Sequence, residues 1–207
     1  GCCPGRARTS ISRPSSSPSR ATARRARVSS ISATAGFTLS GSPTLFTRSF
    51  DNQSTTGQWT GSGTLTLDSA TFTNSGTLTV TGDGHLARNN PGTFSNSGLF
   101  EKNGGTGITL INDSLLTFNN TGTVRVTTGT LNMSSGFNNS GVVDVAAGKV
   151  MNINGTGSGA GDYALASGAT VNFTGGTLAL TSGADITGPG SVSVSGGTVN
   201  INAGATY

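Results

Sequence analysis

The sequence predicts an all-β protein, and three observations support this fold class. Its 207 residues include 33 glycines, and only 10% are charged and 6% aromatic. The apolar residues are mostly valine, leucine, isoleucine and phenylalanine among many threonines, serines and asparagines, a composition that disfavours helices and suits strands and turns. A short pattern headed by phenylalanine also recurs along the chain. A helical bundle or a nucleotide-binding α/β fold is therefore not expected.

The first segment, residues 1–36, differs in composition from the rest. Eight arginines and no acidic residue lie within residues 1–50, whereas residues 51–207 hold four basic and eight acidic residues. With little to bury, residues 1–36 are expected to be disordered by themselves. A targeting segment, a mis-assigned start and a non-native addition all remain open for this segment.

The same segment excludes several classes of function. It lacks the aromatic residues that stack on bases, so binding of nucleic acid is not expected. Cys2 and Cys3 are adjacent and lie outside the expected fold, so we expect neither a metal site nor a cofactor. No apolar run is long enough for a secretory signal or a membrane helix. We therefore expect no membrane span, and an export signal would lie outside this sequence.

Residues 37–57 are predicted to cap the start of the fold, and residues 58–207 to form its repeats. The sequence Phe-Thr-Asn-Ser-Gly-Thr-Leu-Thr-Val begins at Phe72, and related sequences begin at Phe94, Phe118 and Phe137. Alternation of apolar and polar residues within each unit is typical of strands with one buried face. A further apolar pair follows each unit, so each repeat offers three short strands. Such strands bury a face only by stacking on their copies.

The chain is therefore predicted to be a parallel β-solenoid of about six to seven coils with three short strands per coil. Degenerate units headed by Leu165 and Ile186 are expected to continue the series to the C-terminus, with a loop over residues 155–161.

Equivalent positions should stack into ladders along the solenoid. We expect one inward aromatic stack and one asparagine ladder at a corner; the members are Phe72, Phe94, Phe118, Phe137 and Asn74, Asn96, Asn120, Asn139. The glycine two residues after each asparagine is predicted to allow a positive φ at the bend. Lys102 departs from the pattern, because it stands where Val80, Val126 and Val145 stand in the other units.

The Phe-x-Asn-x-Gly unit, followed by alternating apolar residues, resembles the repeats of bacterial autotransporter passengers and filamentous haemagglutinin-like adhesins, including the autotransporter-associated β-strand repeat type. The resemblance covers roughly residues 58–207. It implies a right-handed coil, export across a bacterial envelope, and a stalk or adhesive role. Because the same architecture carries adhesins, lyases and spacers, the resemblance indicates fold more strongly than activity.

One outward column offers candidate catalytic residues. Glu101, Arg125 and Asp144 each follow an inward residue and should lie in line. Carboxylates two coils apart, on the order of 9 to 10 Å, would be near the separation used by inverting glycosidases. Alternating charges in a ladder also arise simply because like charges repel, and we favour that interpretation.

The sequence therefore predicts a non-catalytic structural or adhesive repeat segment of a secreted or cell-surface bacterial protein. A carbohydrate-active β-helix enzyme, either a polysaccharide lyase or a glycoside hydrolase, is the alternative. Expected partners are surface glycans, surface proteins, or copies of the chain that associate through coil ends. The expected location is extracellular or on the bacterial cell surface.

Overall fold

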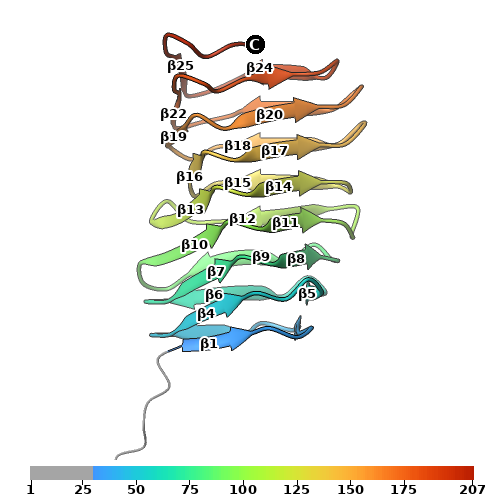
Figure 1. Ribbon diagram of the computed structural model, residues 1–207, viewed down its shortest axis with the longest axis vertical. Helices are drawn as coiled ribbons and strands as arrows, with labels where there is room; N and C mark the ends of the chain where they lie inside the picture. Colours follow the sequence, from blue (N-terminus) through green and yellow to red (C-terminus); the bar gives the residue numbers. More distant parts are fainter. Residues whose placement is uncertain (1–29) are drawn as a thin grey trace, which may run out of the picture.

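The computed structural model describes residues 30–207, which form strands joined by short corners, without a helix in that range. Apart from β16, each strand up to β22 pairs in parallel with the strand three places later in the chain, so successive coils stack into the column seen in Figure 1. Strands β1 to β24 form eight coils of three strands, and β25 follows. The predicted parallel β-solenoid with three strands per coil is confirmed, with slightly more coils than expected.

Three sheets form the walls of the solenoid. Sheet A contains β1 (Ser30–Ala33), β4 (Ser49–Asn52), β7 (Thr71–Asn74), β10 (Gly92–Asn96), β13 (Leu116–Asn120) and β16 (Gly136–Asn139). Sheet B contains β2 (Thr38–Leu39), β5 (Gly57–Trp59), β8 (Thr77–Val80), β11 (Leu99–Lys102), β14 (Thr123–Val126), β17 (Val142–Val145), β20 (Asp162–Leu165) and β23 (Ile186–Thr187).

Sheet C contains β3 (Thr44–Phe46), β6 (Thr64–Asp68), β9 (His85–Arg88), β12 (Ile108–Ile111), β15 (Thr130–Met133), β18 (Val150–Ile153), β21 (Thr170–Phe173) and β24 (Ser191–Val194). A short sheet D contains β19 (Gly157–Gly159), β22 (Thr177–Leu180) and β25 (Thr198–Ile201). Because β19 lies against β16, sheet D continues the wall of sheet A.

The core runs through the centre of the column and is filled by alternate residues of every strand. In β14, for example, Val124 and Val126 are fully buried while Thr123 and Arg125 face outward. The period of two in the sequence therefore sorts side chains as predicted. Each apolar residue also stacks on its equivalents in the coils above and below.

The coils begin earlier in the chain than the repeats indicate. Strand β1 pairs with β4, so residues 30–33 belong to the solenoid and not to a disordered segment. The range 37–57, predicted as a capping region, contributes strands to three sheets. These first coils lack most of the repeat signature, yet Phe50 aligns with Phe72 and extends its stack. The remainder of the basic segment, residues 1–29, lies outside the described residues.

The last coils differ from the prediction in register. Leu165 pairs with Val145 and Ile186 pairs with Tyr163, both in sheet B, so neither continues the phenylalanine series. Residues 157–159 form β19 where a loop was expected. The prediction failed because a Gly-Ser-Gly strand replaces the Phe-x-Asn unit in this coil and leaves no apolar signature.

The glycines that follow the asparagine ladder serve a different purpose from the one predicted. Gly98 and Gly122 do not adopt positive φ. A Cβ atom at Gly98 would instead collide with the backbone carbonyl of Gly76 in the coil below. Close approach of successive coils at this corner is therefore what requires glycine.

Candidate functional site

The predicted charged column exists as a column. Glu101 lies beside Arg125, and Arg125 lies beside Asp144, in adjacent strands of sheet B. Arg125 Nε donates to Asp144 Oδ2 at 2.8 Å, and the two side chains are 40% and 38% exposed. Glu101 Oε2 instead lies 3.5 Å from Nδ2 of Asn103, the residue that directly follows the same strand, β11. The arginine is therefore paired with one carboxylate and not placed evenly between two.

This geometry suits a surface ion pair better than a pair of catalytic acids. A glycosidase needs one carboxyl group with a raised pKa and room for a substrate between the two. Here Arg125 occupies the strand position between Glu101 and Asp144 and pairs with Asp144, and the column lies on an outer sheet face. The Arg125–Asp144 pair can help to hold two coils in register. Because it is exposed, it contributes at most about 1 kcal/mol to the free energy of unfolding.

The structure places the predicted aromatic residues in one continuous stack. Phe72 and Phe94 have ring centroids 4.8 Å apart, and Phe94 and Phe118 are 4.7 Å apart, with nearly parallel rings. Phe137 continues the series at 5.9 Å with a tilted ring. Phe100, from sheet B, packs edge-on against Phe94 and Phe118. Stacked and edge-on contacts are the favoured geometries for aromatic pairs.

The predicted asparagines form a hydrogen-bonded ladder parallel to this stack. Asn74 Nδ2 donates to Asn96 Oδ1 at 2.6 Å, and Asn96 and Asn120 repeat the bond to the next coil at 2.8 Å. Each Nδ2 also donates to a backbone carbonyl of the next coil. The ladder ends at Asn139, whose Nδ2 has no partner among the described residues because Gly159 lies above it.

Sequence reasoning missed the first members of both ladders. Phe50 stacks on Phe72 at 4.9 Å, and Asn52 Nδ2 donates to Asn74 Oδ1 at 2.6 Å. The signal was present, since Phe50-Asp-Asn52 stands 22 residues before Phe72-Thr-Asn74. The repeat is hard to recognise here because Ser54 stands two residues after Asn52, where the other units have glycine.

Lys102 is the one basic residue that the described coils bury completely. Its Nζ donates to Asp83 Oδ1 at 2.8 Å, to the carbonyl oxygens of Gly82 and Gly104, and to Thr109 Oγ1. These four acceptors satisfy an ammonium group where other coils carry valine. The hydrogen bond from Lys102 lowers the pKa of Asp83, and one from the backbone of Gly107 adds to the effect. The cluster is fully paired, which indicates a structural ion pair and not a reactive lysine.

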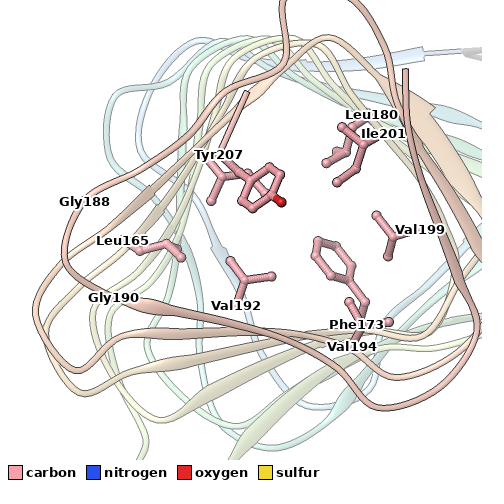
Figure 2. Close-up of a pocket in the computed structure, with 11 residues that line it drawn as sticks. Leu165, Phe173, Leu180, Gly188, Gly190, Val192, Val194, Val199, Ile201 and Tyr207 are labelled. Carbon is pink, nitrogen blue, oxygen red and sulfur yellow. The ribbon is translucent and has the colours of Figure 1, made fainter. Parts of the chain in front are cut away.

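The C-terminal end of the column contains an apolar hollow of about 560 Å³. Figure 2 shows Val192, Val199, Ile201 and Tyr207 around a central space, above the buried ring of Phe173. Val192, Val199 and Ile201 belong to the last strands, Tyr207 follows them, and Val194 beside them is 57% exposed. Apolar side chains are therefore open to solvent at this end of the described column.

The described residues hold neither a metal-binding cluster nor a membrane-spanning helix. Among residues 30–207, no group of three or more histidine, cysteine, aspartate or glutamate side chains is arranged to hold a metal ion. No helix in the described part of the chain is long and apolar enough to cross a membrane. The lone His85 faces outward on β9 and is half-buried.

Comparisons with models of protein families, with curated proteins and with solved structures found no match. The class of protein is therefore defined by the fold alone: a repeat protein built as a parallel β-solenoid.

Proposed function

We propose that this chain is a non-catalytic structural repeat segment that supplies a rigid rod with a repetitive polar surface. The observation that carries the proposal is the continuous Asn52 to Asn139 ladder, which fixes successive coils in one register. Eight coils at about 4.8 Å each give a rod roughly 40 Å long.

We further propose an adhesive role at an extracellular or bacterial cell-surface location. Support comes from the resemblance of the repeats to those of secreted adhesins, and from the uncharged polar character of the outer faces. Sheet C, for example, presents Asn132, Asn152 and Asn172 as an outward amide ladder with hydrogen bonds of 2.7 and 2.8 Å. Each amide retains hydrogen-bonding capacity toward a partner. Surface glycans or surface proteins are the expected partners.

The experiment that tests this function measures binding and cleavage together. The purified chain is incubated with a panel of polysaccharides, and pull-down and newly formed chain ends are measured in the same samples. We expect no new chain ends. Cleavage that Glu101→Gln or Asp144→Asn abolishes, and that the control Asp51→Asn leaves intact, would establish the alternative, a carbohydrate-active enzyme.

Association of copies through coil ends is a second candidate role, and the apolar C-terminal hollow favours it. Parallel sheets have complementary edges, so a coil of another copy can extend sheets B, C and D. Sedimentation at increasing concentration tests this role. Val194→Lys should weaken the association, and unchanged association would exclude the hollow as its site.

A further inference from the structure

Two polar hollows lie along one corner of the solenoid, where strands of sheet C lead into the next strands of sheets A and D. The first, about 410 Å³, is lined by residues 69–71, 91–93, 115 and 117. The second, about 330 Å³, is lined by residues 114, 134–136 and 154–156. Ser114 lines one hollow and Leu115 the other, so the two are neighbours along the axis. We call them together the corner groove.

The corner groove is lined without charge. None of the side chains that line its two hollows is acidic or basic; they are serines, threonines, one asparagine, glycines and a few apolar residues. Phosphate groups and acidic sugars are commonly recognised by arginine or lysine, and cationic ligands by carboxylates. The lining therefore selects a neutral ligand.

One wall of the groove carries a regular row of hydroxyl groups. Thr71, Thr93 and Thr117 are directly paired in register on the outer face of sheet A, one per coil. Their spacing is therefore about 4.8 Å, the distance between hydrogen-bonded strands. At the opposite corner the hydroxyl of Thr121 donates to the backbone oxygen of Asn96, but the three groove threonines make no such bond within residues 30–207. A hydroxyl can both donate and accept, so the row can match a partner that also carries hydroxyls.

A second observation also indicates a ligand. Ser135 is fully buried, lines the second hollow, and its Oγ has no hydrogen-bond partner among the described residues. A buried hydroxyl without a partner costs free energy, which a bound polar group in the hollow can recover.

An exposed apolar side chain stands between the two hollows. Leu115 is 63% exposed on a ridge formed by residues 113–115. Asp113 holds this ridge, because its Oδ1 accepts from the Leu115 backbone nitrogen at 2.9 Å and lies 3.0 Å from Arg88 Nε. Asp113 also adopts a positive φ of 129°, an unusual conformation for a residue other than glycine. The ridge thus presents an apolar surface beside the hydroxyl row.

From these features we propose that the corner groove binds a neutral glycan that lies along the solenoid axis. Sugar rings have hydroxyl edges and apolar faces, so the threonine row and Ser135 would hydrogen bond to the edges while Leu115 covers a face. A repeat of one coil is close to the length of one sugar unit in an extended chain, which lets successive coils make equivalent contacts. This inference rests on the proposed adhesive role and names its ligand class and site.

The test uses isothermal titration of the full chain with dextran, laminarin and mannan as neutral probes and with alginate as a charged one. The triple variant Thr71→Val, Thr93→Val, Thr117→Val removes three hydroxyls and keeps β-branched side chains that suit strands. We expect binding of at least one neutral probe, no preference for alginate, and about a tenfold or greater rise in Kd for the triple variant. The matched control is Thr79→Val, Thr123→Val, Thr170→Val, three outward positions away from the groove, and should bind as the wild type does.

Ser135→Ala keeps the test informative if the triple variant fails to fold. Because the hydroxyl is buried without a partner, the substitution should leave the thermal unfolding temperature unchanged or raise it, while binding weakens. Binding of a neutral glycan that neither groove variant changes would overturn the corner groove but leave the adhesive role standing. Binding to none of the probes would overturn the corner groove as a glycan site and would restrict the adhesive role to surface proteins.

Discussion

The buried Lys102–Asp83 pair allows a quantitative test of how this solenoid tolerates a charge in its core. Lys102 is fully buried, whereas the Asp83 side chain is 34% exposed. Asp83→Ala removes one of four acceptors of the ammonium group and leaves the charge buried. A hydrogen bond to a charged group contributes about 1.5 to 3 kcal/mol, and water can partly replace a partner as exposed as Asp83. We therefore expect a loss of about 1 to 2 kcal/mol in the free energy of unfolding.

The partner substitution completes a double-mutant cycle. Lys102→Met places an apolar side chain where the neighbouring coils have Val80 and Val126. Replacement of a buried ion pair by apolar residues is often neutral or stabilising, so Asp83→Ala should cost much less in the Lys102→Met background. The coupling energy between the two sites, measured by urea unfolding followed by far-UV circular dichroism, should be about 1 to 2 kcal/mol.

The coupling should also depend on pH in a defined direction. The pKa of Asp83 is lowered in the folded protein from its ordinary value of 3.8. Its contribution to stability is therefore fully present above that value and is lost as the pH falls through the lower, folded pKa. A coupling energy below about 0.3 kcal/mol at pH 7, or one that persists after Asp83 is protonated, would refute the reasoning.

Three further substitutions test the ladders and the charged column. Phe94→Ala should cost about 3 to 5 kcal/mol of unfolding free energy, since its ring is buried between two others, and a loss under about 1 kcal/mol in chemical denaturation would contradict the stack. Asn120→Ala should cost about 2 to 4 kcal/mol because it interrupts the buried ladder. Its outward neighbour Asn119→Ala loses only one part-buried hydrogen bond, from Asn138, and should cost about 1 kcal/mol or less; equal melting temperatures for the two would count against the ladder. Arg125→Ala should cost at most about 1 kcal/mol, and the cost should fall in high salt because its pair with Asp144 is exposed; a larger, salt-independent loss would show that the column does more than pair charges.

How much of the fold the sequence predicts depends on how completely each coil carries the repeat. Where Phe-x-Asn and the following glycine are all present, the predicted strands, the aromatic stack and the asparagine ladder match the structure. The first coils were assigned to a cap because only Phe50 and Asn52 retain the signature. The later coils were placed out of register because Gly157–Gly159 replaces an apolar strand, and glycine leaves no periodicity to follow.

The candidate sites were less accessible to sequence reasoning, for a physical reason. Lys102 stood out as an exception, but its partner Asp83 lies 19 residues away, in the turn of the previous coil, and no local pattern connects them. The corner groove depends on the lengths and backbone conformations of several corners, including the positive φ of Ser69 and Asp113. The corner groove arises because coils of unequal length stack on one another. The sequence of one repeat by itself does not show how its corner will stack on the next.

The parallel pairing of strands from successive coils has a mechanical consequence. The hydrogen bonds between coils run along the axis of the rod, so tension applied through the two ends of the chain opens them one coil at a time, from an end inward. Each released coil of about 20 residues adds roughly 70 Å of extended chain. Under load the rod should lengthen in a regular series of steps, with the firmest resistance where the stacked phenylalanines and the asparagine ladder run together through the middle coils.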